Sequence, residues 1–413
     1  MRHTILNGDV IACLRSLPDA CVQCVVTSPP YWGLRDYGVE GQIGLEPTPE
    51  EHVEKMVEVF REVKRVLRDD GTLWLNYGDC YVHGTPGGGS PFDNGRNDGR
   101  ESYDTDKARG REKLSTLAPG LKTKDLVGMP WRIAFALQAD GWYLRSDIIW
   151  SKPNPIPESA TDRPTKSHEY VFLLTKRPRY FYDADAIREP YAESTFKRAK
   201  SVNNAAARKD NGTAINQRGL TAEQQTKAYS KVTETGGRNK RSVWHIATQS
   251  FSEAHFATFP EALVEPCIKA GTSARGACPK CGAPWRRVVE KGGGTTGASW
   301  HDHSNDLVRG QVGPASALGR SRMTGRRYYR RDIGWQPSCT CGCEETIPCV
   351  VLDPFGGSGT VAKVARDLGR SSILIEINPE YVQIAKKRLR IGEQLDSGVC
   401  EYVVKNFLTE ATP

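Results

Sequence analysis

The sequence lacks the features that are typical of membrane and secreted proteins. It contains no run of about 18 apolar residues, so we expect no transmembrane helix and no membrane partner. The first residues show no secretory pattern of positive charge, apolar stretch and small-residue cleavage site, which predicts a cytoplasmic protein. With 38% hydrophobic and 26% charged residues, the 413-residue chain has the composition of a globular protein.

Two common nucleotide-binding motifs are also missing. A glycine-rich turn at 353–360 lies between an apolar run and a helical pattern, but it is neither G-x-G-x-x-G nor a Walker Gly-Lys-Ser/Thr sequence, which argues against NAD and ATP. Glu376 ends the next expected strand, 23 residues after Asp353, where a carboxylate can accept hydrogen bonds from ribose hydroxyls. The turn therefore indicates an adenosine-containing cofactor, and a tight turn without a ligand is the alternative.

The hydrophobic pattern alternates between short apolar runs and helical periodicity. Short links between such segments predict an α/β fold with a parallel sheet. A helix is expected to stop before Gly71. Strands are expected at 4–6, 22–26, 72–76, 143–150, 169–174, 349–352 and 372–375, and helices at 10–14, 51–67, 124–139, 361–368 and 379–389.

A second motif follows the apolar run at 22–26 and consists of Ser28, Pro29, Pro30 and Tyr31. Two consecutive prolines cannot continue a strand, so the chain must leave the sheet here. The loop offers a hydroxyl, a backbone carbonyl and an aromatic ring. An amino group conjugated to a ring becomes nucleophilic when its N–H groups are accepted by Ser28 Oγ and the Pro29 carbonyl, while Tyr31 stacks on the base. The alternative is a structural loop with a packed tyrosine.

With these motifs, the sequence resembles the β-class DNA amino-methyltransferases of bacteria and phages. Such enzymes carry an S/D-P-P-Y motif near the N-terminus and an F-x-G-x-G motif near the C-terminus, and 28–31 and 355–359 match in that permuted order. The resemblance extends to 7–9, 255–260 and 375–378, and covers 1–180, 251–275 and 346–392. It implies a Rossmann-like, S-adenosylmethionine-dependent methyltransferase sheet, circularly permuted, with a basic insertion and a small zinc-binding insertion.

The resemblance also implies roles for individual residues. S-adenosyl-L-methionine would be the cofactor, and the target base would be flipped out of double-stranded DNA into the loop at 28–31. Serine as the first motif residue favours cytosine N4 as the target, with adenine N6 as the alternative. The residues implied at the cofactor are Asp353, Phe355, Gly357 and Gly359 along the methionine, Glu376 at the ribose, Asp9 near the adenine, and Phe259 and Pro260 lining the pocket.

Four cysteines have the spacing of a structural metal site. Cys278 and Cys281 form a C-x-x-C pair, and Cys339 and Cys341 supply the other half of a tetrahedral Zn²⁺ site, with Cys343 as a rival fourth ligand. Reduced surface thiols are the alternative. The 57 residues between the two halves contain an arginine-rich stretch without acids from Val308 to Arg331, which suits contacts with DNA phosphates. A solvated basic loop is the competing interpretation.

A second basic stretch, 187–241, has twelve Lys or Arg against five Asp or Glu and is read as a DNA-recognition segment or as a solvated insertion. The expected organisation is 1–182 catalytic half, 183–250 basic insertion, 251–275 cofactor-flanking segment, 276–345 zinc-binding insertion, 346–392 cofactor-binding half and 393–413 C-terminal tail.

Two other functions remain open at this point. One is a zinc-containing DNA-binding protein with an inactive methyltransferase core, and the other is methylation of a protein glutamine, which usually goes with asparagine at the position of Ser28. A cognate restriction endonuclease is a possible partner of the DNA-methylating enzyme.

Overall fold

The computed structural model describes residues 1–34, 38–82, 120–194, 237–249, 259–292, 329–391 and 401–407. The chain divides into two compact units. Unit 1 comprises 1–187, 241–286 and 337–413, and unit 2 comprises 188–240 and 287–336. None of the described helices is long and apolar enough to span a membrane.

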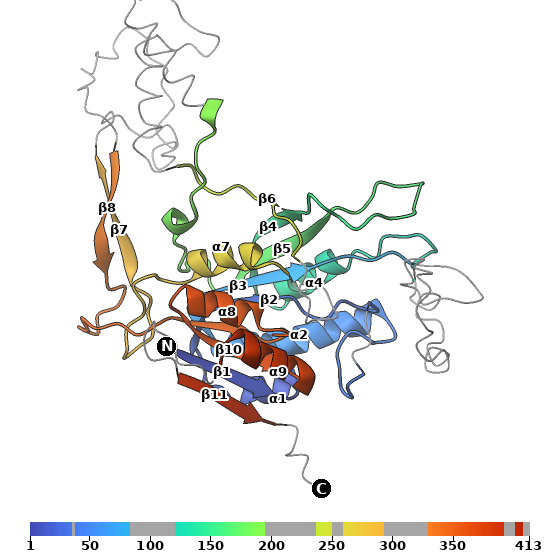
Figure 1. The fold of residues 1–413 in the computed structure, drawn as a ribbon, viewed down its shortest axis with the longest axis horizontal. Helices are drawn as coiled ribbons and strands as arrows, with labels where there is room; N and C mark the ends of the chain where they lie inside the picture. The colour runs from blue at the N-terminus through green and yellow to red at the C-terminus, as the bar shows by residue number, and fades with distance from the viewer. Residues whose placement is uncertain are drawn as a thin grey trace, which may run out of the picture. The chain divides into compact units, whose positions relative to one another are not determined.

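Unit 1 is built on a nine-stranded sheet (Figure 1). β5 is antiparallel to both of its neighbours, β3 and β4, and the other pairs are parallel. β9 and β10, which come late in the chain, lie between β1 and β2. From one edge to the other the strands are β11 (Glu401–Asn406), β1 (Arg2–Asn7), β10 (Ser371–Glu376), β9 (Val350–Asp353), β2 (Val22–Thr27), β3 (Leu67–Tyr77), β5 (His168–Thr175), β4 (Tyr143–Ser151) and β6 (Val243–His245).

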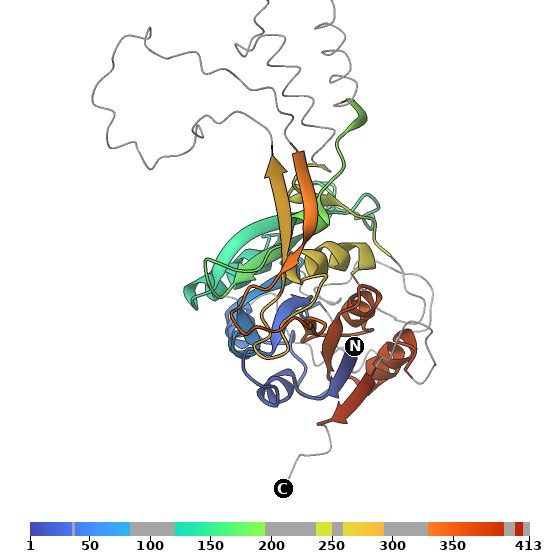
Figure 2. The ribbon, with the colours of Figure 1, turned by 90° about the vertical axis from the view of Figure 1, so that its left-hand side faces the viewer.

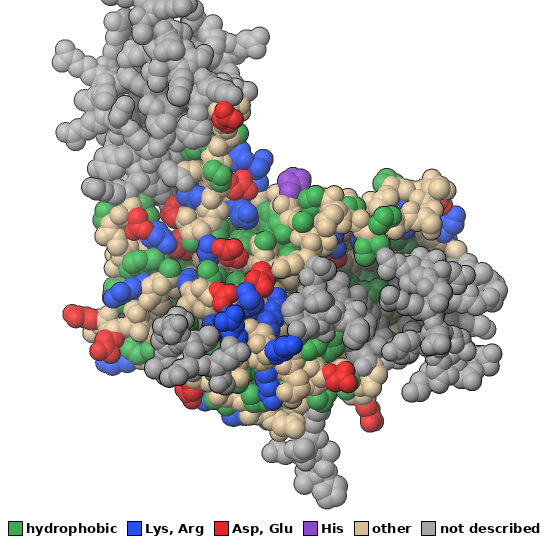
Figure 3. All heavy atoms as spheres, viewed as in Figure 1, with side chains coloured by type: hydrophobic (Ala, Val, Ile, Leu, Met, Phe, Trp, Pro, Cys, Tyr) green, Lys and Arg blue, Asp and Glu red, His purple; other side chains and the backbone are tan. Residues whose placement is uncertain are grey.

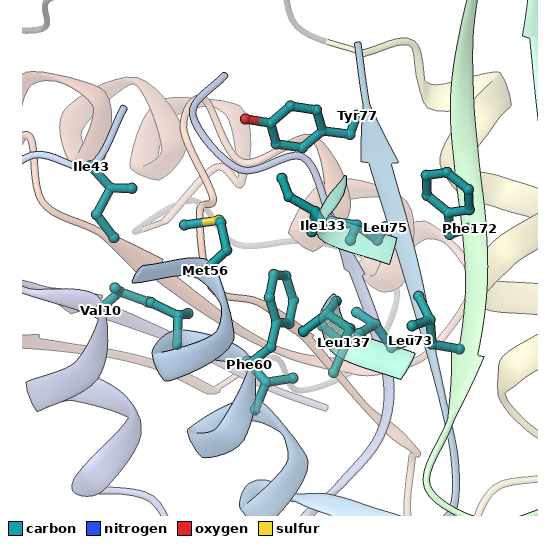
Figure 4. Close-up of a cluster of buried hydrophobic side chains, with 14 of the residues drawn as sticks. Val10, Ile43, Met56, Phe60, Leu73, Leu75, Tyr77, Ile133, Leu137 and Phe172 are labelled. Atoms are coloured by element: carbon teal, nitrogen blue, oxygen red, sulfur yellow. The ribbon is translucent and has the colours of Figure 1, made fainter. Parts of the chain in front are cut away.

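Helices cover both faces of this sheet because successive strand residues point to opposite sides. On β3, Leu73, Leu75 and Tyr77 join one core cluster, whereas Trp74 joins the other. The first cluster, shown in Figure 4, is covered by α1 (Val10–Arg15), α2 (Pro49–Val66) and α4 (Met129–Ala139). The opposite face is covered by α7 (Glu261–Gly271), α8 (Thr360–Asp367), α9 (Pro379–Arg388) and the 3₁₀ turn η1 (Ala184–Ile187).

The helix α2 shows how the sequence specifies such an element. Thr48 caps it by accepting a hydrogen bond from the Glu51 amide at 3.2 Å, and Pro49 occupies its first turn, where no amide hydrogen is needed. Its buried residues recur at helical spacing and fill the core beneath β3: Met56, Val59, Phe60, Val63 and Val66.

The fold differs from the sequence-based expectation in four places. The sheet is mixed rather than parallel, because β5 runs antiparallel to both β3 and β4. The helix expected from 124 begins at Met129, since Gly128 is left-handed (φ 77°) and Pro130 suits only the first turn. Gly71 lies inside β3, which starts at Leu67, so the helix end is set by the strand and not by the glycine. Residues 393–413, expected to be a tail, include the edge strand β11.

Unit 2 contains a two-stranded sheet of β7 (Arg286–Gly292) and β8 (Tyr329–Gln336), visible in Figure 2. Arg287 joins the strands, because its guanidinium pairs with Asp332 and lies 4.5 Å from the ring centre of Trp335. In the other segment of this unit, Glu189 and Arg238 exchange backbone hydrogen bonds at 2.9 and 2.8 Å. The arginine-rich stretch before Tyr329 and most of the basic stretch at 187–241 lie outside the described residues.

Candidate functional site

The two motifs meet at one edge of the sheet, because the carboxyl ends of neighbouring parallel strands lie side by side. Thr27 ends β2 and Asp353 ends β9, and the two strands are paired. The Thr27 hydroxyl donates to Asp353 Oδ1 at 2.8 Å, and the Phe355 amide donates to the same oxygen at 3.1 Å. The buried Asp353 carboxylate therefore ties the start of the Ser28–Tyr31 loop to the start of the glycine-rich turn.

The glycine-rich turn needs glycine for specific steric reasons. A Cβ on Gly356 would lie 2.1 Å from Leu374 Cγ, so a side chain there cannot be accommodated. Gly357 and Gly359 have φ values of 49° and 81°, which favour glycine. The Gly357 amide donates to Glu376 Oε2 and the Asn378 amide to Oε1, both at 2.8 Å. Glu376 thus fixes the turn while remaining partly exposed.

Burial raises the pKa values of both carboxyl groups at this edge. The pKa of Asp353 is raised to about 7, with burial as the main cause, and the hydrogen bonds from Thr27 and Phe355 offset only part of it. Burial also raises the pKa of Glu376. A carboxylate that is costly to ionise when buried gains most from a cationic neighbour, so Asp353 suits a positively charged ligand.

Arg388 anchors the C-terminal end of the turn. Its Nη1 donates to Ser358 Oγ at 3.0 Å and to Thr360 Oγ1 at 2.9 Å, and its Nη2 donates to Glu261 Oε1 at 2.9 Å. Lys363 pairs with Glu261 as well, at 2.8 Å. Figure 3 shows basic and acidic side chains lying side by side on one face of the molecule. The contacts tie α7, α8 and α9 to the turn.

The other residues implied at the cofactor occupy the surrounding elements. Asp9 follows β1, which pairs with β10; its side chain is exposed and caps α1 by accepting from the Ala12 amide at 2.9 Å. Pro260 is buried at the start of α7, and Phe259 packs against the cluster that includes α8. Their expected contacts with a cofactor stay predictions. Residues 255–258 of the matching segment lie outside the described part of the chain.

The Ser28–Tyr31 loop is held by Tyr77 at the end of β3. The Trp32 amide donates to the Tyr77 hydroxyl at 3.0 Å, and this oxygen lies 3.3 Å from the Pro30 carbonyl oxygen. The rings of Tyr31 and Tyr77 are 4.6 Å apart. A small pocket beside them is lined by Tyr31, Trp32, Leu34, Tyr77, Gly78, Asp79, Cys80 and Met129.

Tyr77 is itself fixed by a buried histidine. His52 Nε2 lies 2.8 Å from the Tyr77 hydroxyl oxygen, and His52 Nδ1 lies 2.7 Å from Glu46 Oε2. Burial disfavours the ionised form of Glu46, but the hydrogen bond and charge interaction with His52 outweigh it and lower the pKa of Glu46. Glu46 and His52 therefore hold the Tyr77 hydroxyl in the position in which it contacts the Ser28–Tyr31 loop.

Tyr31 also touches a partly buried ion pair that the sequence analysis did not identify. Its hydroxyl lies 2.9 Å from Glu169 Oε2, and Glu169 pairs with Lys152. Asn76 Nδ2 donates to the same Glu169 oxygen at 3.1 Å. Lys152 comes directly after β4 and Glu169 stands near the start of the antiparallel strand β5, so both lie at the edge that carries the motifs. The sequence signal that could have identified Lys152 and Glu169 is a charged residue at the end of an expected strand.

The structure brings together the four cysteines with metal-site spacing. The sulfur atoms of Cys278, Cys281, Cys339 and Cys341 all lie within 4.8 Å of one another, and Cys343 is not part of this group. Hydrogen bonds from the backbone, first that of Cys281, lower the pKa of the Cys278 thiol to about 6. Interactions with Cys281 and Cys339 raise the pKa of the Cys341 thiol to about 12. Four thiols that converge in this way suit a tetrahedral Zn²⁺ ion, which binds thiolates.

The cysteine cluster is connected to the sheet at the edge opposite the motifs. Gln23, buried near the start of β2, donates from Nε2 to the Gly282 carbonyl at 3.0 Å and accepts from the Val350 amide at 2.6 Å. Arg68 donates to the Cys281 carbonyl. The turn after the C-x-x-C pair is thus attached to the first residue of β9, and the cluster belongs to unit 1 rather than unit 2.

Comparison with known proteins is consistent with this arrangement. A family model described as DNA methylase matches residues 22–278 and 349–387. The type II methyltransferase M.XycI of Xanthomonas campestris pv. cyanopsidis is 39% identical over 94% of this chain and 87% of its own length. M.SmaI of Serratia marcescens, also a type II methyltransferase, is 35% identical over 93% of this chain and 90% of its own length.

Among the solved structures to which this chain is similar is a PvuII DNA methyltransferase described as cytosine-N4-specific. It is 15% identical to this chain, with a TM-score of 0.48, and the match covers 96% of this chain and 89% of that one. The family model and the relatives cover most of the sequence, including both motifs at the sheet edge. The chain therefore belongs to the N6/N4 DNA methylase family and is a DNA methyltransferase.

Proposed function

We propose that the protein transfers a methyl group from S-adenosyl-L-methionine to the exocyclic amino group of a flipped base in double-stranded DNA, with cytosine N4 as the favoured target. The observation that carries the proposal is the Thr27–Asp353 hydrogen bond, which joins the amine-binding loop to the glycine-rich turn. It supports a single site in which a base and a methyl donor face each other. The family model that matches the chain, described as DNA methylase, agrees with DNA as the substrate.

On the cofactor side, S-adenosylmethionine would supply a methyl group on a positively charged sulfonium. The turn would admit it because Gly357 and Gly359 leave the backbone bare, and Asp353 would offer a buried negative charge. Glu376 keeps acceptor capacity for ribose hydroxyls, since each of its oxygens takes one backbone hydrogen bond and can take a second. Phe355, Asp9, Phe259 and Pro260 would complete the pocket.

On the base side, Ser28 Oγ and the Pro29 carbonyl would accept the two N–H groups of the target amine. These hydrogen bonds draw the nitrogen lone pair out of conjugation with the ring, so they are strongest as the methyl group is transferred. Tyr31 would stack on the flipped base, and Pro30 keeps the loop rigid. Replacing Ser28 with alanine should therefore lower turnover more than the affinity for DNA or cofactor.

Mass spectrometry of nucleosides from treated DNA tests the target base. N4-methylcytosine is the expected product, because the first motif residue is serine. Detection of N6-methyladenine alone would overturn the choice of base and leave the mechanism standing. Full activity of the Ser28→Ala variant would overturn the role given to Ser28. If label from S-adenosylmethionine never reaches DNA, the alternative of a zinc-containing DNA-binding protein with an inactive core takes precedence.

The same proposal includes the chain order and the metal. We interpret the placement of β9 and β10 between β1 and β2 as a circular permutation of the methyltransferase sheet. The four-cysteine cluster is proposed to bind one structural Zn²⁺ ion at the amino ends of the strands, away from the chemistry. The basic segments would contact DNA, and a restriction endonuclease that cuts the same site would be the functional partner.

A further inference from the structure

We propose that Glu169 is a positioning residue for methyl transfer: it sets the direction of a hydrogen-bond chain through Tyr31 to Ser28, so that Ser28 Oγ meets the target amine as an acceptor. This inference rests on the proposed function of the Ser28–Tyr31 loop. A serine hydroxyl can donate or accept, and only acceptance activates an amine. Something must therefore decide where the Ser28 hydrogen points.

The surroundings of the Tyr31 hydroxyl leave it one arrangement. It lies 2.9 Å from Glu169 Oε2 and 3.3 Å from Asn76 Oδ1, and both atoms are acceptors. Burial, followed by the Glu169 charge, raises the pKa of Tyr31, so the phenol keeps its hydrogen. Because that hydrogen is donated to one of these acceptors, the Tyr31 oxygen is left to accept from Ser28 Oγ at 3.4 Å. A bond of this length can shorten when the substrate closes the site.

The orientation of Asn76 depends on Glu169 as well. Asn76 is buried, and its Nδ2 donates to Glu169 Oε2 at 3.1 Å and to the Tyr170 carbonyl at 3.0 Å. Because Asn76 Nδ2 must face these two acceptors, the Oδ1 atom of the same amide faces the Tyr31 hydroxyl. Every partner of Tyr31 on this side is thus an acceptor, and Glu169 supplies the charge that makes the arrangement strong.

Lys152 keeps Glu169 in the state that the chain needs. Burial disfavours the Glu169 carboxylate, but the Lys152 ammonium and the hydrogen bonds outweigh it and lower the pKa of Glu169. An ionised carboxylate accepts and cannot donate. The chain of contacts therefore runs from Lys152 through Glu169, Tyr31 and Ser28 to the target amine. The hydrogen of Ser28 points inward, and the lone pairs of its oxygen point to the base.

The test is a double-mutant cycle measured in single turnovers on double-stranded DNA with S-adenosylmethionine. Glu169→Gln keeps the shape but puts a donor group near the Tyr31 hydroxyl. We expect the rate of methyl transfer to fall about a hundredfold, while the dissociation constants of DNA and cofactor change less than about twofold. In a Ser28→Ala background, the same substitution should cost less than about threefold, because no hydroxyl remains to be oriented.

The matched control is Glu158→Gln. Glu158 forms an ion pair with Arg163 in unit 1, and removing its charge should leave the rate of methyl transfer unchanged. An equal loss from Glu169→Gln in the wild-type and Ser28→Ala backgrounds would overturn the inference and indicate a merely structural role, as would wild-type rates for Glu169→Gln.

If Glu169→Gln does not fold, the cycle of Tyr31→Phe with Ser28→Ala replaces it. The inference requires the Tyr31 hydroxyl to matter only while Ser28 is present, so additive losses in that cycle would reject it. Failure of the wild-type protein to methylate DNA would instead reject the proposed function.

Discussion

The Thr27 hydroxyl donates a hydrogen bond of 2.8 Å to Asp353 Oδ1, although the two residues are 326 positions apart in the sequence. Thr27 immediately precedes Ser28, and Asp353 opens the glycine-rich turn. The bond therefore connects the residues proposed to bind the base with those proposed to bind the cofactor. It also places a buried carboxyl group, with a pKa raised to about 7, between the two sites.

The affinity for S-adenosylmethionine should rise with pH up to about 7. Below that pH, Asp353 is protonated in the ligand-free protein, and a cationic ligand must first displace the proton. Linkage then predicts up to about a tenfold gain in affinity per pH unit, levelling off above the pKa. Calorimetry across this pH range measures the affinity for S-adenosylmethionine. Asp353→Asn is the matched control, and it is expected to bind S-adenosylmethionine weakly and with little pH dependence. A flat wild-type profile would contradict the proposed contact.

The same group should affect stability in the opposite direction. The folded-state pKa of Asp353 is raised above the unfolded value of about 3.9. Its contribution to stability is therefore fully present below the unfolded pKa and is lost as pH rises through about 7. Relative to Asp353→Asn, the free energy of unfolding of the ligand-free wild type should decline over that interval, as measured by urea denaturation. A constant difference would show that Asp353 does not titrate there.

Replacing Tyr77 with phenylalanine should weaken both the fold and catalysis. The ring stays, but the Trp32 amide and His52 Nε2 lose their common partner. Unsatisfied buried groups should cost about 1–3 kcal/mol of stability, and the looser Ser28–Tyr31 loop should lower kcat more than it raises KM for DNA. Chemical denaturation and steady-state kinetics measure the two effects. Tyr143→Phe, on an exposed tyrosine, serves as control, and equal behaviour of both variants would refute the role of Tyr77.

Elemental analysis should find about one zinc ion per chain. Cys341→Ser should lose the metal and Cys343→Ser should retain it, because the Cys341 sulfur lies in the cluster and that of Cys343 does not. Zinc loss should lower the melting temperature, since Gln23 links the cysteine turn to the first residue of β9. Metal-free protein with an unchanged melting temperature would contradict the zinc site. If Cys341→Ser kept the zinc ion and Cys343→Ser lost it, Cys343 rather than Cys341 would be the fourth ligand.

The sequence was sufficient for the parts of the site that lie on parallel strands. The ends of the apolar runs at 22–26 and 349–352 predicted where the chain leaves the sheet, and the carboxyl ends of parallel strands share an edge. Four of the twelve cysteines were singled out by their spacing, and they converge in space. The fold class followed from the same alternation of strands and helices.

The sequence was insufficient where residues reach the site by other routes. Glu169 stands at the amino end of β5, and it lies at the motif edge only because β5 runs antiparallel, which the pattern did not predict. His52 and Tyr77 sit within regular apolar patterns, and their hydrogen bond arises from the packing of α2 on β3. Such pairings depend on tertiary contacts that have no local signature.

DNA binding should weaken steeply with salt, and the arginine-rich stretch should account for part of that dependence. The arginines concerned, Arg326, Arg327, Arg330 and Arg331, belong to a stretch without acidic residues. Each phosphate contact releases counterions and contributes about one unit to the slope of log affinity against log salt. Replacing the four with alanine should flatten the slope by up to about four units, measured by fluorescence anisotropy. Lysine at the same positions is the control: it keeps the charge and should keep the slope. An unchanged slope in the alanine variant would show that this stretch does not contact DNA.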